Sequence, residues 1–172
     1  LCSYLTKGGT QFPFQDGSVV LYLGASTGTT VSHVSDIVGK NGIVFALDFA
    51  PRVLSDLVFL AEERSNIAPI LADAGDVMNF ADKVCQADIV FQDVAQKNQL
   101  EIFLRNVDLF LKQGGFGYVA IKARSVDVTK KPNIIFDMVK RQIKENKSLE
   151  LVDSRILDPF QKDHCMFVVK KR

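Results

Sequence analysis

The stretch "VVLYLGASTGTTVSHVSDIVG" (residues 19–39) has the layout of a nucleotide pocket. Its apolar start predicts a strand, and valines that recur at three- and four-residue steps predict a helix after it. Between the two, Gly24 and Gly28 allow a tight turn and a close approach of the backbone to a ligand. Thr29 and Thr30 open the helix, whose first N–H groups favour a polar or anionic group. The pattern indicates an α/β protein with a ligand site beyond its first strand.

The composition is that of a globular chain. It has 172 residues, of which 47% are hydrophobic and 24% are charged, so we expect one domain over residues 1–172. The net charge of +1 neither demands nor excludes a nucleic-acid partner. The apolar runs are too short to span a bilayer, and no membrane partner is expected.

The three cysteines, Cys2, Cys85 and Cys165, are far apart and odd in number. No CxxC or Cys/His spacing is present, so we expect no metal site. We interpret the cysteines as reduced thiols of an intracellular protein, with no role beyond inert packing.

Apolar runs alternate with helical patterns along the chain. Strands are expected at 18–23, 43–48, 67–73, 87–94 and 116–123, and helices at 29–38, from Pro51 to about Arg64, from about Lys97 to Lys112, and from Pro132 to about Asn146. "QGG" (113–115) is expected to end the third helix. This alternation indicates a parallel sheet with helices on both faces. The final runs, 149–156 and 164–171, have no helix between them and predict an antiparallel hairpin at one edge.

Carboxylates follow three of the predicted strands, at Asp48, Asp73 and Asp93. Ligands bind beyond the carboxyl ends of parallel strands, so the three are expected at one rim. Asp48 is suited to the hydroxyls of a ribose, Phe49 to stacking on a base, and Asp73 to the amine of an adenine. The alternatives are helix caps for the two aspartates and a core position for Phe49. The turn is neither G-x-G-x-x-G nor a P-loop, so the set indicates S-adenosylmethionine rather than NAD.

Asp93 and Lys122 end neighbouring predicted strands, which places them within reach of one substrate. A lysine acts as a base only when it is neutral, and the positive sulfonium of the methyl donor favours that form. The alternative is a structural Asp–Lys ion pair. His164 begins the last strand, and the hairpin could bring it to the same rim. His33 lies inside the first predicted helix and is expected to be structural.

Four stretches carry a resemblance to a known family. They are "VLYLGASTGTTVSHVSDIVG" (20–39), "DIVFQDVAQ" (88–96), "GGFGYVAIKARSVDVTKKP" (114–132) and "KDHCMFVV" (162–169). Together they resemble the fibrillarin family, the methyltransferases of box C/D ribonucleoprotein particles. Their amino-acid sequence is closer to the archaeal branch of that family. The resemblance implies a class I S-adenosylmethionine-dependent methyltransferase fold: a mostly parallel, Rossmann-like sheet of seven strands with an antiparallel C-terminal edge hairpin. It also implies that the N-terminal region of the family is missing from this sequence.

The resemblance implies roles for individual residues. Asp48 and Phe49 would contact the ribose and adenine, Asp73 and Ala74 the adenine edge, and Asp93 and Gln96 the methionine end. The turn supplies the remaining expected cofactor contacts: Gly24, Ala25, Ser26, Gly28, Thr29 and Thr30.

Asp93, Lys122 and His164 match three members of the family's Lys-Asp-Lys-His catalytic set. The first lysine of that set would fall at or immediately before Leu1. In the implied reaction, a methyl group passes to the ribose 2′-hydroxyl of RNA. Lys122 would take the hydroxyl proton, Asp93 would orient Lys122 and the methyl donor, and His164 would hold the network or the target ribose.

The resemblance also implies partners. These are a box C/D guide RNA with its target, a Nop-family scaffold protein and a kink-turn-binding ribosomal-type protein, acting in pre-rRNA and tRNA processing. "KARSVDVTKK" (122–131) is either a phosphate-contacting patch or an ordinary solvated loop. The location would be cytoplasmic in an archaeon and nucleolar in a eukaryote. Two other functions stay open: a catalytically weak methyltransferase-like subunit and an NAD-binding Rossmann dehydrogenase.

Overall fold

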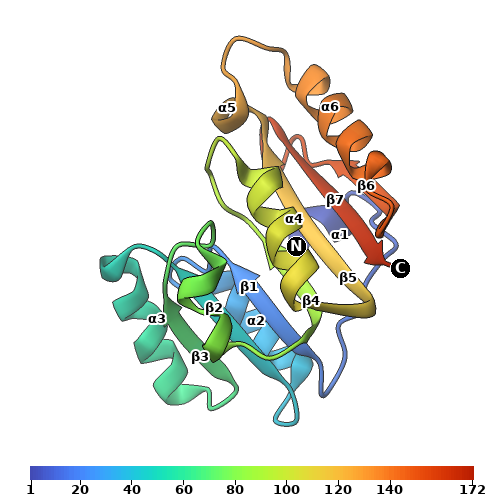
Figure 1. Cartoon of the computed structure of the whole chain (residues 1–172). Coiled ribbons are helices and arrows are strands. Elements are labelled where there is room, and N and C mark those ends of the chain that lie inside the picture. Colours follow the sequence, from blue (N-terminus) through green and yellow to red (C-terminus); the bar gives the residue numbers. More distant parts are fainter.

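A seven-stranded sheet with the order β3-β2-β1-β4-β5-β7-β6 runs through the protein, as the computed structural model of residues 1–172 shows (Figure 1). The strands are β1 (Val19–Leu23), β2 (Ile43–Asp48), β3 (Ile67–Leu71), β4 (Ala87–Gln92), β5 (Leu111–Lys122), β6 (Leu149–Ile156) and β7 (His164–Lys171). All pairings among the first five strands, β1 to β5, are parallel. β7 is antiparallel to both of its neighbours, β5 and β6. The predicted fold class is confirmed, including the antiparallel hairpin at the C-terminal edge.

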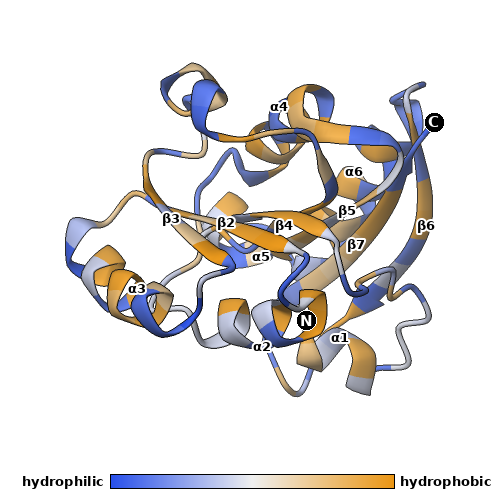
Figure 2. Cartoon of the chain, turned by 90° about the horizontal axis from the view of Figure 1, so that it is seen from below, coloured by the Kyte–Doolittle hydropathy of each residue, from blue (hydrophilic) through white to orange (hydrophobic).

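Helices cover both faces of this sheet. They are α1 (Cys2–Thr6), α2 (Thr29–Val38), α3 (Pro51–Glu63), α4 (Gln99–Phe110), α5 (Ala123–Val126) and α6 (Pro132–Glu145), with 3-10 turns η1 (Val77–Asn79) and η2 (Ala81–Lys83). Figure 2 shows α1, α2 and α3 on one side of the sheet and α4 and α6 on the other. None of these helices combines the length and apolar character needed to cross a membrane.

Each face of the sheet has its own apolar core, so the central strands are buried on both sides. In β1, Val20 and Tyr22 pack on the α2 side, whereas Leu21 and Leu23 pack on the α4 side. A strand buried on both faces needs a continuous apolar run rather than an alternating pattern. This explains why "VVLYL" carries no polar residue.

The predicted boundary between the third helix and the strand after it is wrong. The helix expected to reach Lys112 ends at Phe110, and residues 113–115 lie inside β5 instead of stopping the helix. Leu111 already pairs with Ala87 of β4, and the register then shifts before the next pairs. Gly114 has a φ of +75°, a conformation that glycine adopts without strain. The glycines therefore accommodate an irregularity within a long strand.

The packing role predicted for the cysteines is wrong at two of the three positions. All three are free thiols, but Cys2 and Cys85 are exposed, and only Cys165 is buried. Cys2 lies on the exposed first turn of α1, and Cys85 lies in the loop before β4. Neither position belongs to an apolar stripe or strand, so no core is available to them.

Two long-range contacts fix the ends of the chain. The Tyr4 hydroxyl donates to Asp153 Oδ2 at 2.8 Å and ties α1 to β6. Lys171 Nζ, near the end of β7, donates to the carbonyls of Val107, Asp108 and Leu111 at 3.1, 2.7 and 2.9 Å. These carbonyls lie at the end of α4, where that of Val107 also accepts the N–H of Leu111, so Lys171 caps that helix.

Candidate active site

A cavity of about 290 Å³ opens at the carboxyl ends of the central strands. Its walls are Gly24, Ser26, Leu47, Asp48, Phe49, Ala74, Asp93, Val94, Ala95 and Gln96. These residues follow β1, β2, β3 and β4. The strand order reverses between β1 and β4, so the cavity lies at the topological switch point, where open α/β sheets bind ligands.

The turn after β1 brings its backbone close to the end of β4. Gly24 has a φ of +83°, and a β-carbon there would lie 2.5 Å from the carbonyl oxygen of Asp93. Only glycine allows this approach. Ser26 has a φ of +51°, and its N–H donates to Asp48 Oδ2 at 2.8 Å. The carboxylate of β2 thus stabilises the turn of β1.

Asp48 and Phe49 lie where a nucleoside would need them. Asp48 is 9% exposed, and its two oxygens accept the N–H groups of Ser26 and Ala50 at 2.8 and 3.0 Å. A carboxylate oxygen has two lone pairs, so each oxygen keeps one for a ribose hydroxyl. Phe49 is 67% exposed, so its interpretation as a core residue is wrong. Its ring is free to stack on a base.

Five of the predicted cofactor residues do not line the cavity. Ala25 is buried, and Gly28 packs against α3, because a β-carbon there would lie 2.5 Å from Leu60 Cδ2. Thr29 and Thr30 form the start of α2, whose N-cap offers no side-chain hydrogen bond. Asp73 Oδ1 accepts the N–H of Gly75 at 2.8 Å within a local turn and does not cap a helix, the alternative considered for it. Their contacts with a cofactor stay predictions.

Asp93, Lys122 and His164 share one face of the sheet. Asp93 follows Phe91 by two residues, Lys122 follows Ala120, and His164 precedes Met166. Those three apolar residues belong to the core on the α2 side, and side chains alternate along strands. The structure therefore brings the predicted catalytic side chains to one rim, on three neighbouring strands.

Asp93 and Lys122 are near each other without being paired. Gln92 lies opposite Val119, so Lys122 lies about two residues, or 6–7 Å, further along the strand direction than Asp93. No ion pair joins them, and the interpretation as a structural Asp–Lys pair is wrong.

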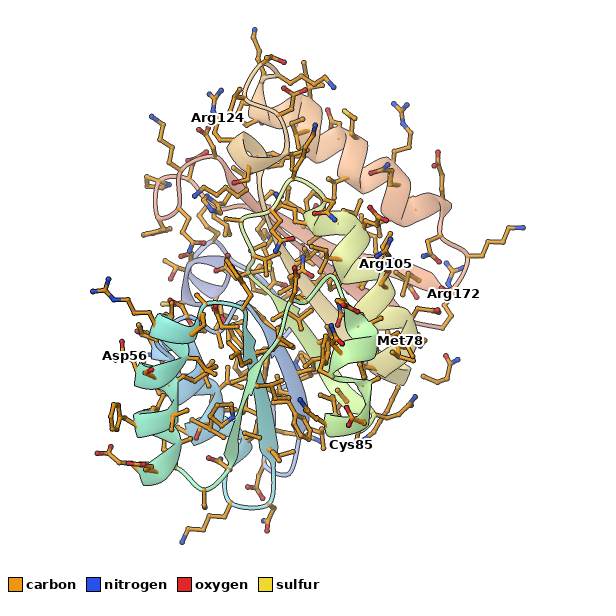
Figure 3. The ribbon with its side chains drawn as sticks, turned by 60° about the vertical axis from the view of Figure 1, so that its left-hand side comes forward. Asp56, Met78, Cys85, Arg105, Arg124 and Arg172 are labelled. Atoms are coloured by element: carbon orange, nitrogen blue, oxygen red, sulfur yellow. The ribbon has the colours of Figure 1, made fainter.

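His164 is held by the loop before it. Its Nδ1 lies 2.6 Å from the carbonyl oxygen of Lys162, which can only accept, so Nδ1 carries a proton, and in the neutral imidazole Nε2 is the acceptor. Arg124, a residue of α5 that Figure 3 labels, donates its Nε–H to Asp163 Oδ2 at 3.1 Å. The Asp163 carbonyl accepts the N–H of Ala123 at 3.0 Å, which joins this loop to the end of β5.

Leu1 lies at the same rim, with its backbone nitrogen near Asp93. The resemblance places the first lysine of the catalytic set at or immediately before this position.

Sequence reasoning missed Gln99. It is fully buried in the first turn of α4, and its Oε1 accepts the Lys122 N–H at 2.9 Å. A signal was present, since Gln99 and Asn106 occupy the buried stripe that Ile102, Phe103 and Val107 continue. A polar residue on the apolar stripe of a helix indicates a specific buried partner.

The basic loop at 122–131 is partly neutralised by its own acids. Lys130 Nζ lies 3.4 Å from Asp127 Oδ2, and Arg124 is paired with Asp163. Lys131 is exposed, and its side chain forms no ion pair. Apart from Lys122, which also forms no ion pair, Lys131 is thus the one unpaired cation in this loop that could contact a phosphate.

Comparison with known proteins identifies the family. The model of the family described as fibrillarin matches residues 1–172. The chain belongs to the fibrillarin family. A fibrillarin-like rRNA/tRNA 2′-O-methyltransferase of Methanocaldococcus jannaschii is 48% identical over 168 residues, covering 98% of this chain and 72% of the relative.

Two solved fibrillarins share the fold. Aeropyrum pernix fibrillarin, solved with natively bound S-adenosyl-L-methionine, has a TM-score of 0.88 and 40% identity over 98% of this chain and 73% of that one. A fibrillarin/Nop5p complex matches with a TM-score of 0.93 and 35% identity, covering all of this chain (100%) and 80% of the other. The sheet is thus that of a class I methyltransferase, and the resemblance inferred from the four stretches is confirmed.

Proposed function

We propose that the protein transfers a methyl group from S-adenosylmethionine to the ribose 2′-hydroxyl of rRNA and tRNA. The observation that carries the proposal is the placement of Lys122 and His164 on the same rim as the Asp48–Asp93 cavity. A dinucleotide-binding dehydrogenase is disfavoured, because the turn after β1 lacks the G-x-G-x-x-G pattern. The fibrillarin relatives, which bear the name of this activity, support the proposal.

The cavity fits the methyl donor. Asp48 has a spare lone pair on each oxygen for the ribose, and Phe49 presents an exposed ring for the adenine. Gly24 lets the backbone approach the ligand closely. Asp93 and Gln96 also line the cavity and are suited to the methionine end of the donor. When bound, S-adenosylmethionine supplies an electrophilic methyl group on a positively charged sulfonium.

The residues of the rim orient the target and move its proton. Lys122, in its neutral form, would accept the proton of the 2′-hydroxyl as the oxygen bonds to the methyl carbon and the sulfur–carbon bond breaks, which would release S-adenosylhomocysteine. Asp93, which is not paired with Lys122, would stabilise positive charge at the rim and orient the methyl donor. His164 offers Nε2 as an acceptor for a neighbouring ribose hydroxyl, because Nδ1 is committed to Lys162. Alignment of the reacting groups supplies much of the rate in such a displacement.

The target would be chosen by partners. We propose that the protein is the catalytic subunit of a box C/D particle, with a guide RNA, a Nop-family scaffold protein and a kink-turn-binding protein. The fibrillarin/Nop5p complex of a relative supports the scaffold. The chain itself has a net charge of only +1, and its basic loop holds only one unpaired lysine besides the proposed base, which suits recognition by guide pairing rather than by the protein.

Reconstitution tests this function. The protein is assembled with the two partner proteins and a guide RNA, and the target RNA is digested and analysed for 2′-O-methylnucleosides. We expect one methylated nucleotide, set by the guide and absent when the guide is mismatched. Donor binding without methylation would make the chain a catalytically weak subunit. If calorimetry shows tight binding of NAD instead of S-adenosylmethionine, the proposed methyltransferase function is wrong.

A further inference from the structure

Gln99 joins the two halves of the site through one side-chain amide. Its Nε2 donates to the carbonyl oxygens of Gln96 and Lys122 at 3.0 and 3.2 Å, and its Oε1 accepts the Lys122 N–H at 2.9 Å. Gln96 lines the donor cavity, and Lys122 is the proposed base. The side chain is 0% exposed, so water does not compete for these bonds.

The side-chain amide of Gln99 takes the place of a neighbouring strand at Lys122. Pairing of β4 with β5 ends at Gln92 and Val119, three residues before Lys122. The edge of Lys122 that faces β4 therefore has no strand neighbour for its N–H and C=O. A glutamine amide carries one carbonyl and one NH₂, the same groups as a peptide bond, and satisfies both.

A second buried amide fixes Gln99 in turn. Gln92, the last residue of β4, is fully buried and donates Nε2 to the Gln99 carbonyl at 2.5 Å. The end of β4, the start of α4 and the end of β5 are thereby joined in one hydrogen-bonded chain. Gln92 Oε1 is buried without a hydrogen-bond partner. The orientation of the Gln92 amide thus makes the bond to Gln99 and leaves its own carbonyl oxygen unsatisfied.

We propose that Gln99 is a positioning residue, which fixes the backbone of Lys122 relative to the donor cavity and so sets the distance between the base and the methyl group. The proposal rests on the methyltransferase function proposed above. Gln99 lies behind the reacting atoms and acts only through Lys122 and Gln96. Misplacement by about 1 Å costs about a hundredfold in rate when two reacting groups must align.

The test replaces Gln99 by Met, which keeps the length of the side chain and removes its hydrogen bonds. In the reconstituted particle, we expect kcat to fall by about tenfold to a hundredfold, whereas the Kd for S-adenosylmethionine stays within about threefold. The pH at half-maximal kcat shifts, because the lysine is no longer held in its native surroundings. Gln99→Glu keeps the acceptor for the Lys122 N–H and retains more activity than Gln99→Met.

Asn66 provides the matched control. Its amide also makes three hydrogen bonds, to the Ser35 hydroxyl at 2.6 Å and to the carbonyls of Ser35 and Gly39 at 2.9 Å each. It precedes β3, at the opposite end of the sheet from the cavity. Asn66→Leu should lower the melting temperature while kcat and its pH profile, measured well below the transition, stay as in the wild type.

Three results would overturn the positioning role. They are an unchanged kcat in Gln99→Met, a loss that keeps the wild-type pH profile, and an equal loss in Asn66→Leu. If Gln99→Met does not fold, Gln99→Glu carries the same comparison of kcat, Kd and pH profile. A wild-type particle that methylates nothing contradicts the proposed function instead, so the two failures are distinguishable.

Discussion

Lys122 and His164 lie directly opposite each other in the antiparallel pairing of β5 and β7. Opposite residues on one face of such a pair have β-carbons about 4.5–5.5 Å apart. The β5–β7 pairing therefore places the proposed base beside its neighbouring histidine, and the Gln99 amide holds the backbone of Lys122.

Replacing Lys122 by Ala should remove methylation and spare donor binding. The side chain points to the rim but is not a wall of the donor cavity. We expect kcat to fall by about a hundredfold or more, the range of a lost general base, and the Kd for S-adenosylmethionine to change little. Equal activity in the variant would exclude Lys122 as the base.

Replacing Asp48 by Ala should abolish measurable donor binding in calorimetry. The change removes the ribose acceptor and the two bonds that hold Ser26 and Ala50. Asp56 is exposed on the outer side of α3 (Figure 3), and Asp56→Ala is the control expected to bind as the wild type does. Wild-type affinity in Asp48→Ala would move the ribose site elsewhere.

The tyrosines should resist ionisation in the folded protein. Burial, and then the hydrogen bond to Asp153, raises the pKa of Tyr4 to about 12, and burial also raises the pKa values of Tyr22 and Tyr118. An unfolded tyrosine titrates near 10. The neutral phenols therefore stabilise the fold fully below about pH 10, and this contribution is lost as the pH rises through about 12.

An absorbance titration at alkaline pH measures this directly, because the chain has 3 tyrosines and no tryptophan (0). Tyrosinate should appear only together with unfolding, seen by circular dichroism. Ionisation of any tyrosine near pH 10 in a folded sample would contradict the burial. Tyr4→Phe serves as the control, since it removes the hydroxyl bonded to Asp153 and reduces the titrating groups by one.

The three thiols should fall into two classes. Burial raises the pKa of Cys165 to about 12, so its thiolate is scarce at pH 8, whereas Cys2 and Cys85 are exposed. Two thiols should react rapidly with a disulfide reagent, and the third only when the sheet opens. Cys165→Ala should remove the slow phase alone. Three rapid thiols would show that β7 is open in solution.

Sequence patterns predicted the regular elements because their apolar residues recur with a clear period. The helix at 29–38 and the strands at 43–48, 149–156 and 164–171 have the boundaries expected. The predicted end of α4 was wrong, because "QGG" has a composition typical of a helix C-terminus but also occurs within an irregular strand. Local composition does not report a register shift.

The site was predicted correctly where charged or polar side chains recur at the ends of successive strands. Asp48, Phe49 and Asp93 line the cavity, and Lys122 and His164 share the rim with them. Gly28 was not distinguishable from Gly24, since both sit in one turn and only packing against α3 separates them. Gln99 was missed because its partners are backbone groups, which every residue carries and no sequence motif marks.

The position of β7 between β5 and β6 determines when the site can exist (Figure 1). In a nascent chain, β6 emerges before β7 and has no neighbour to pair with until residues 164–171 have left the ribosome. The strand that completes the sheet is also the strand that carries His164. Closing the fold and completing the reactive rim are thus a single event, so an unfinished polypeptide has no competent site with which to engage RNA.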